Sequence, residues 1–404
     1  MKRAGLRLFA ARCALPGPAA CLLLALLLAM GLLLAVTGCG PSGQDNEAPD
    51  IAVLAQGAPG FEQARPGKAL EFPRDHGAHP GYRIEWWYLT ANLQDAKGRP
   101  YGAQWTLFRF AARPPGNDTG TDQGASAWNS GQVYMAHMAI THPDGHVAFQ
   151  RYARGGGHGG PRGDSHEALE QAGATAAPFA AWLDDWRLAS SGAGWLPLEL
   201  RARQDDFGMA LQLEATGPMV LQGDAGFSQK HAGGGGSYYY SQPFLEATGT
   251  LELGGRRVAV SGQAWLDREW SSQFLQPDQA GWDWFALHLD SGEKLMLFRL
   301  RARGGGGDYR HGVLISADGR ARTLDPSRIA LLPMAETVVA GRALPLHWRV
   351  DLPEVGRSLE LQALHPEQWL DVDFPYWEGV VLVRGDGAGN SGRGYLELTG
   401  YARR

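Results

Sequence analysis

Asp267 is the residue whose surroundings point most directly to chemistry. It lies in a strand-like run after the tight turn Gly254-Gly255, and a hairpin centred on that turn predicts which residues share its face. That face is predicted to carry Asp267, Trp265, Tyr240, Tyr238 and Gln263. A carboxyl group among aromatic rings is poorly solvated, so its pKa should rise and its acid form can protonate an alkene. The aromatic rings would stabilise the resulting cation, and Tyr238 or Gln263 would hold the attacking water.

The same residues also allow a structural interpretation. In that hairpin Asp267 lies opposite Gln242, and Glu269 lies opposite Tyr240. An Asp that accepts hydrogen bonds from tyrosine hydroxyls, or that pairs with Arg268, would tie the strands together without transferring a proton. Buried ion pairs shift pKa values as catalytic sites do, so the sequence leaves both interpretations open.

A second pair of charges is predicted inside the protein. A hairpin centred on Lys97 places Glu85 directly opposite Arg109, and both share a face with Trp87 and Trp105. Opposite charges among aromatic rings are more typical of a buried structural ion pair than of catalysis. Arg109 is therefore expected to keep Glu85 ionised.

Two histidines precede this hairpin, in the segment His76-Gly77-Ala78-His79. Two imidazoles at this spacing, with Glu85 as a third ligand, would suit a metal ion, but the sequence offers no evident fourth ligand. The alternative is that both imidazoles and Asp75 hold the turn before the first strand. We favour the turn and predict neither a metal nor an organic cofactor, since protonation itself would supply the electrophile.

These residues are predicted to lie on short β-strands joined by tight turns. Inward and outward residues alternate through 84–90, and hairpin turns follow at Gly254-Gly255 and Asp290-Ser291-Gly292. We find no long helical periodicity outside the N-terminal segment. The fold class is therefore all-β, a sandwich or a barrel. We place a domain boundary near residue 240, beside the glycine run 233–236.

Composition agrees with this class and excludes others. The 404 residues include 56 Gly and 14 Trp, and 20% are charged, which fits a globular chain rich in turns and rules out collagen, a coiled coil and a wholly disordered chain. The formal net charge is −5 and the sequence has no basic stripe, so nucleic acid is a poor partner. G-x-S-x-G, H-E-x-x-H and P-loop motifs are absent from the sequence.

The N-terminal segment is predicted to be the export signal of a lipid-anchored protein. A basic start is followed by an apolar run over 19–35 and by Val36-Thr37-Gly38-Cys39, in which small residues precede the cysteine. Cys39 would receive lipid after cleavage of residues 1–38, and residues 39–68 would form a flexible tether. The alternative is an uncleaved membrane anchor. We expect the cell envelope, at the periplasmic face or the outer membrane, with a membrane export system as a candidate partner.

Several sequence blocks resemble one known family. They are Phe72-Pro73-Arg74-Asp75-His76-Gly77-Ala78-His79-Pro80, Glu85-Trp86-Trp87-Tyr88, Trp265-Leu266-Asp267-Arg268-Glu269-Trp270, Gly281-Trp282-Asp283-Trp284-Phe285, Tyr376-Trp377-Glu378-Gly379 and Gly394-Tyr395-Leu396-Glu397-Leu398-Thr399-Gly400-Tyr401. In these blocks the chain resembles the carotenoid 1,2-hydratase-like proteins, also called AttH-type, which are related to lipocalins. The resemblance runs from about Leu70 to the C-terminus.

This resemblance implies two consecutive lipocalin-like antiparallel β-barrels, over residues 69–240 and 241–404, with a space for a hydrophobic ligand. The carotenoid enzymes of the family add water across a terminal C=C, and Asp267 falls on their proposed proton donor. Trp270, Trp282 and Trp284 are expected to contact the ligand together with Gln263.

Four residues around Asp267 differ from those of the carotenoid enzymes. Trp265 and Glu269 replace a Tyr and an Asn, while Tyr238 and Tyr240 stand where spacing predicts a His and a Trp. These replacements favour a non-catalytic carrier or chaperone for an isoprenoid or lipid. The alternative is a cofactor-free hydratase, lyase or hydrolase that acts on an unsaturated lipid or isoprenoid, with Asp267 as general acid.

Overall fold

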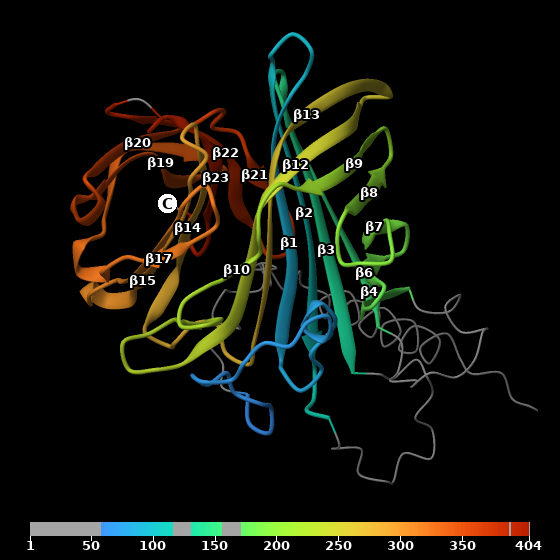
Figure 1. Ribbon diagram of the computed structural model, residues 1–404, viewed down its shortest axis with the longest axis horizontal. Coiled ribbons are helices and arrows are strands. Elements are labelled where there is room, and N and C mark those ends of the chain that lie inside the picture. The colour runs from blue at the N-terminus through green and yellow to red at the C-terminus, as the bar shows by residue number, and fades with distance from the viewer. Residues whose placement is uncertain (1–57, 116–130, 156–170, 388, 404) are drawn as a thin grey trace, which may run out of the picture. The chain divides into compact units, whose positions relative to one another are not determined.

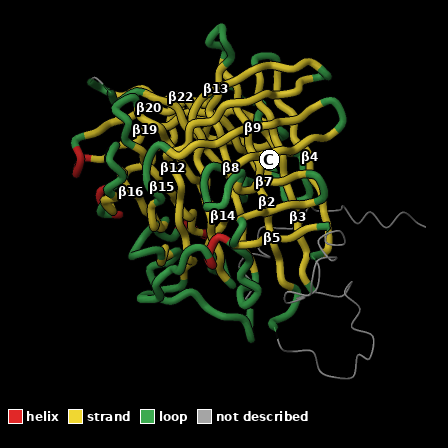
Figure 2. The backbone as a smooth tube through the Cα atoms, turned by 45° about the vertical axis from the view of Figure 1, so that its right-hand side comes forward, coloured by secondary structure: helices red, strands yellow, loops and turns green. Residues whose placement is uncertain are grey.

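The fold is seen in a computed structural model of the chain. The structure describes residues 58–115, 131–155, 171–387 and 389–403, so the predicted signal and Cys39 lie outside the described residues. Strands and turns dominate (Figure 1, Figure 2), and no helix in these ranges is long and apolar enough to cross a membrane. The helices in these ranges are single 3₁₀ turns: η2 (Arg74–His76), η4 (Arg303–Gly305), η5 (Pro326–Arg328) and η6 (Pro353–Val355).

The first sheet is antiparallel and contains the N-terminal strands. In spatial order its strands are β4 (Gly145–Arg154), β3 (Gln132–His142), β2 (Pro100–Ala111), β1 (Ile84–Gln94), β13 (Arg256–Ser271), β12 (Gly236–Leu253), β9 (Phe207–Ala215), β8 (Leu198–Gln204), β7 (Trp186–Ser190), β6 (Phe179–Leu183) and β5 (Ala172–Ala176), while β10 (Val220–Leu221) and β11 (Phe227–Gln229) pair with β12. A bridge between Gly155 and Ala172 joins the end of β4 to β5, so the sheet curls into a nearly closed barrel.

The second sheet is also antiparallel. In spatial order its strands are β17 (Ala321–Thr323), β16 (Tyr309–Ile315), β15 (Lys294–Ala302), β14 (Gln279–Leu289), β23 (Gly392–Leu398), β22 (Tyr376–Gly385), β20 (Arg357–Ala363), β19 (Arg342–Leu352) and β18 (Ala330–Val339), while β21 (Trp369–Leu370) pairs with β22. Within the described ranges its outer strands β17 and β18 do not pair with each other, which makes it a half-barrel. The predicted class, two consecutive lipocalin-like antiparallel barrels, is confirmed.

Strand β1 explains how the two sheets pack. Trp87 and Leu89 point into the first barrel, whose interior is filled by apolar side chains. Trp86 and Tyr88 point the other way and join a second aromatic cluster with residues of the second sheet, such as Trp284. Nearly every residue of β1 is therefore buried, because the barrel core covers one face and the second sheet covers the other.

The change from one sheet to the other lies between Ser271 and Gln279, not near residue 240 as predicted. Strands β12 and β13 form a long hairpin that belongs entirely to the first sheet. The glycine run beside the predicted boundary leads into β12 as a turn, in which Gly234 and Gly235 have positive φ values of 101° and 81°.

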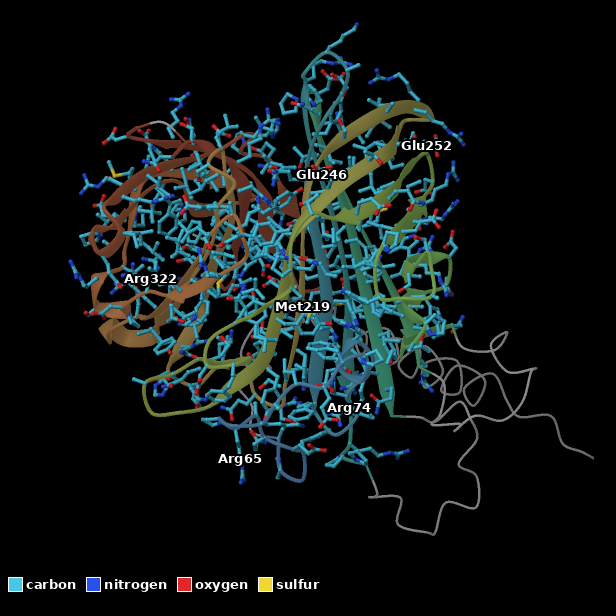
Figure 3. The ribbon with its side chains drawn as sticks, viewed as in Figure 1. Arg65, Arg74, Met219, Glu246, Glu252 and Arg322 are labelled. Atoms are coloured by element: carbon cyan, nitrogen blue, oxygen red, sulfur yellow. The ribbon has the colours of Figure 1, made fainter. Side chains whose placement is uncertain are left out.

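The predicted tether also ends earlier than residue 68. The backbone N–H of Glu62 donates to the carbonyl of Gly81 over 2.9 Å, and the backbone N–H of Arg65 donates to the Tyr238 hydroxyl over 3.0 Å. Figure 3 places Arg65 near the end of the first sheet where β1 begins. Residues 62–65 are therefore packed against the first sheet.

Candidate functional site

A cavity of about 190 Å³ lies between the outer face of the first sheet and the second sheet. Most of its lining is apolar or aromatic and comes from both sheets. The lining residues are Ile84, Trp86, Tyr88, Thr106, Phe108, Phe110, Met135, Tyr152, Lys230, Tyr239, Asp267, Glu269, Phe274, Leu275, Trp282, Trp284, Phe298, Leu300, Phe374, Tyr376 and Glu397. Tyr239 and Asp267 are buried, whereas Phe110 and Phe374 are half-buried and Tyr152 is 50% exposed. The cavity therefore runs from a buried polar end to a more exposed aromatic end.

A β-bulge decides which residues accompany Asp267. From the Gly254-Gly255 turn to Leu245, the β12–β13 pairing follows the predicted register. Pro243 and Phe244 then occupy the space opposite a single residue of β13, and the register shifts by one. A one-residue shift turns every following side chain to the opposite face of its strand.

Because of this shift, Asp267 pairs with Ser241 rather than with Gln242. The tyrosine on its face is Tyr239, whose hydroxyl donates to Asp267 Oδ2 over 2.7 Å. Tyr238 and Tyr240 point into the first barrel instead, so the predicted placement of both beside Asp267 is wrong.

Asp267 accepts hydrogen bonds on both carboxyl oxygens. Trp265 Nε1 donates to Oδ1 over 2.6 Å, and the Ser241 hydroxyl donates to the same oxygen. Burial raises the pKa of Asp267 to about 7, although the hydrogen bonds from Ser241, Tyr239 and Trp265 oppose that rise. Asp267 is thus poised between its neutral and charged forms near neutral pH.

A second carboxyl group reaches the cavity from the opposite wall. Glu397 of β23 accepts a hydrogen bond from Trp282 Nε1 over 2.7 Å and remains half-buried because it lines the cavity. Burial raises its pKa to about 7, the Trp282 bond opposes the rise, and the charge of Asp267 adds to it. The cavity therefore holds one carboxyl group from each sheet that can gain or lose a proton near neutral pH.

Glu378 lies behind this pair on β22, directly opposite Glu397. The Tyr88 hydroxyl of the first sheet donates to Glu378 Oε1 over 2.6 Å. Burial, together with the nearby charge of Glu397, holds the pKa of Glu378 well above its ordinary value. Glu378 therefore links the two sheets through its hydrogen bond with Tyr88.

The remaining predicted site residues are divided between the cavity and other places. Trp282 and Trp284 line the cavity, so their contact with a ligand stays a prediction, and Trp265 is fully buried beside Asp267. Trp270 is on the barrel face, where its ring stacks on His79 with centroids 3.9 Å apart. Gln263 is exposed on β13 and does not line the cavity, so the structure does not bring it together with the other predicted ligand contacts.

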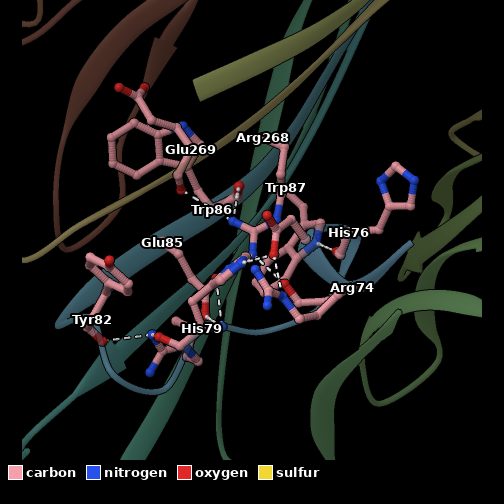
Figure 4. Close-up of polar contacts among 12 residues, drawn as sticks. Arg74, His76, His79, Tyr82, Glu85, Trp86, Trp87, Arg268 and Glu269 are labelled. Atoms are coloured by element: carbon pink, nitrogen blue, oxygen red, sulfur yellow. Dashed lines mark hydrogen bonds and ion pairs between the residues drawn. The ribbon is translucent and has the colours of Figure 1, made fainter. Parts of the chain in front are cut away.

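Glu85 forms the predicted buried ion pair, inside one end of the first barrel (Figure 4). It lies opposite Arg109 in the predicted register and also pairs with Arg268. Burial alone would raise the pKa of Glu85, but the charges of Arg109 and Arg268 hold it well below its ordinary value. All three side chains are buried, which agrees with a structural role.

The two histidines of the first block hold the turn that closes this end. His76 stacks on Trp195 with ring centroids 3.7 Å apart, and its Nδ1 lies 2.7 Å from the Tyr240 hydroxyl. The Nδ1 of His79 lies 3.1 Å from Glu85 Oε2, and its Nε2 lies 3.3 Å from Asp75 Oδ1. Both imidazoles therefore contribute to the packing of this turn.

Sequence reasoning missed Glu397, Tyr239 and the pair formed by Lys230 and Glu269. Glu397 stands in one of the blocks that carry the resemblance, and alternation with Tyr395 places both on one strand face. Tyr239 reaches the face of Asp267 only through the bulge at Pro243 and Phe244, which regular alternation does not predict. Lys230 follows a short strand that lacks clear alternation, and only the packed sheets bring it to the cavity.

The fold thus defines a protein of two packed lipocalin-like barrels, the first nearly closed and the second open. The chain belongs to the AttH-like family, whose model matches residues 63–401. This membership confirms the resemblance that the sequence blocks indicated. A search of curated proteins by sequence gave no match.

Solved structures agree with this assignment. An AttH protein from Nitrosomonas europaea is 34% identical over 85% of this chain and 100% of its own, with a TM-score of 0.72. Kievitone hydratase from Nectria haematococca shares the fold at 14% identity, over 86% of this chain and 98% of its own, with a TM-score of 0.59. CghA, solved with Sch210972, shares it at 16% identity, over 85% of this chain and 97% of its own, with a TM-score of 0.51.

Proposed function

We propose that this protein binds an unsaturated isoprenoid or lipid between its two sheets and adds water to a C=C of that ligand. The observation that carries the proposal is the pair Asp267 and Glu397, one carboxyl from each wall of an aromatic cavity, with pKa values of about 7. Groups that titrate near the working pH are suited to general acid–base catalysis. The fold shared with kievitone hydratase supports a hydration by analogy.

The proposed reaction needs one acid and one base. Protonated Asp267 donates its proton to one alkene carbon, and the ring faces of Tyr239 and Trp284 stabilise the cation that forms on the other carbon. A water molecule adds to that carbon and gives a proton to ionised Glu397. Transfer of that proton back to Asp267 restores both groups, so the net change is addition of H and OH across the double bond.

A carrier function is the second candidate, and one observation favours it. Asp267 already accepts hydrogen bonds from Ser241, Tyr239 and Trp265, which is typical of a carboxylate that holds strands together. In a carrier the same aromatic cavity would hold the ligand without changing it, as the altered residues around Asp267 led us to expect.

Two measurements distinguish these functions. Native mass spectrometry after gentle purification should detect a co-purifying isoprenoid or lipid, and incubation of that ligand class in H₂¹⁸O should then yield the ¹⁸O-labelled alcohol. Asp267→Asn and Glu397→Gln should each lower turnover by about 10²-fold or more while ligand affinity changes little. The exposed Gln263→Ala serves as the control.

Binding without any ¹⁸O incorporation would favour the carrier. An empty protein that takes up no isoprenoid, lipid or hydrophobic dye would contradict both functions.

We further propose that Cys39 anchors the chain to a membrane of the cell envelope, where the ligand would be available. The motivation is the run of small residues before Cys39, followed by no later cysteine in the sequence. Cys39→Ala should give unprocessed and unlipidated protein on a gel and by mass spectrometry, and normal processing of that variant would refute the anchor.

A further inference from the structure

The cavity has an ion pair on its wall that the proposed acid–base chemistry does not use. Lys230, just after β11, lies with its Nζ 2.7 Å from Glu269 Oε1. Both side chains line the cavity, although only 8% of the Lys230 side chain and 7% of the Glu269 side chain are exposed. The Ser237 hydroxyl also donates to Glu269. The pair is thus held in place inside an otherwise aromatic wall.

The Lys230 ammonium group retains hydrogen-bonding capacity after pairing with Glu269. Among the described residues Glu269 is its one salt-bridge partner, and the ring centroids of Phe298 and Tyr239 lie 4.4 Å and 5.2 Å from its Nζ. An ammonium group has three N–H donors, so donors remain for another acceptor. A buried donor without an acceptor is unfavourable, and the cavity is where an acceptor can enter.

We propose that Lys230 binds a neutral oxygen of the ligand, a hydroxyl or a carbonyl, so that the ligand is an oxygenated amphiphile rather than a hydrocarbon. This inference rests on the proposed function, since it concerns the ligand of the same cavity. A neutral oxygen fits better than a carboxylate because Glu269 already balances the charge of Lys230.

The pair also sets where that oxygen lies relative to the reacting bond. Glu269 and Asp267 are two residues apart on β13 and share a face, which places them roughly 7 Å apart along the strand. The ligand oxygen therefore lies about that far from the double bond that Asp267 would protonate. Lys230 orients the ligand, and Asp267 and Glu397 act on it.

The test compares ligands with one isoprenoid skeleton: farnesol, the hydrocarbon farnesene and the carboxylate farnesoate. Affinities are measured on the full-length, delipidated protein by quenching of tryptophan fluorescence, since Trp86, Trp282 and Trp284 line the cavity. Wild-type protein should bind farnesol about tenfold or more tightly than farnesene, because a hydrogen bond to a charged donor is lost with the hydrocarbon.

The decisive variant removes the ion pair without leaving an unpaired buried charge. Lys230→Met combined with Glu269→Gln should reduce the preference for farnesol to less than about threefold and leave farnesene affinity nearly unchanged. Lys294→Met is the matched control, since Lys294 is also buried between the sheets but does not line the cavity, and it should keep the preference. Glu269→Gln alone should raise farnesoate affinity about tenfold, because it leaves Lys230 with an unbalanced charge.

Equal binding of farnesol and farnesene by the wild type, or an unchanged preference in the double variant, would overturn this inference and leave the proposed function standing. Failure of the wild type to bind any of the three ligands would overturn the proposed function and this inference with it.

Discussion

At the scale of residues, the charge of Asp267 is set by two large opposing effects. Burial disfavours the carboxylate, whereas three hydrogen bonds favour it, and its pKa of about 7 is the result. The sequence predicted the raised pKa from the aromatic surroundings of Asp267. It could not predict Tyr239 and Ser241 as hydrogen-bond donors, because they reach Asp267 only after the register shift in β12.

A first prediction concerns the pH dependence of stability. Between pH 4 and 7 folded Asp267 keeps a proton that the unfolded chain has lost, so its contribution to the free energy of unfolding falls as pH rises through this window. Asp267→Asn removes this pH dependence. The free energy of unfolding of the variant minus that of the wild type should therefore rise by at most about 4 kcal/mol from pH 4 to pH 7. Denaturant unfolding at several pH values measures this.

Other titrating groups also make the free energy of unfolding depend on pH. Buried histidines such as His137 and His311, whose pKa values burial lowers to about 4, favour folding as pH rises over an overlapping range. They are present in both proteins and cancel in the difference. A difference that stays constant from pH 4 to pH 7 would show that Asp267 is ionised throughout.

At the scale of elements, hairpins were the most predictable feature. The Gly254-Gly255 turn fixes the register because glycine supplies the positive φ that such turns require, and pairing follows it to Leu245. The bulge at Pro243 and Phe244 could not be predicted, since proline is compatible with either an edge position or a bulge. That single extra residue changed which tyrosines reach the cavity.

A second prediction tests the bulge directly. Deletion of Pro243 removes the extra residue of the bulge, so residues 236–242 should keep their present partners on β13 in a regular pairing. Tyr239 and Ser241 should then remain beside Asp267, and we expect ligand binding to change little. Pro243→Ala, which keeps the extra residue, should also retain binding. Loss of ligand binding in the deletion variant alone, measured by tryptophan fluorescence, would contradict the assigned role of the bulge.

At the scale of the whole molecule, the two barrels were predictable but their packing was not. Alternation in β1 indicates one buried face, and the sequence contains no direct sign that the face with Trp86 and Tyr88 is covered as well. The second sheet packs on this face of β1 through contacts such as the hydrogen bond from the Tyr88 hydroxyl to Glu378. Those residues are 290 positions apart, so the cavity between them arises only from tertiary packing.

The third prediction follows from having one carboxyl group on each wall. A neutral ligand that fills the cavity displaces water from Asp267 and Glu397 together, and this loss of solvation favours their neutral forms. Both pKa values are about 7 before binding, so the affinity for a neutral ligand such as farnesol should be constant below about pH 7. Above it, affinity should fall by up to about tenfold per pH unit for each group that must regain a proton.

Calorimetric titration in buffers of different ionisation enthalpy should detect the corresponding proton uptake at pH 8. The double variant Asp267→Asn with Glu397→Gln lacks both of these carboxyl groups and should bind the same ligand with an affinity that varies less with pH than the wild type's. Affinity that rises between pH 7 and 8.5 in the wild type would mean that the ligand does not come between the two carboxyl groups. It would place the binding site elsewhere in the protein, because any neutral molecule that excludes water from both walls must favour their protonated forms.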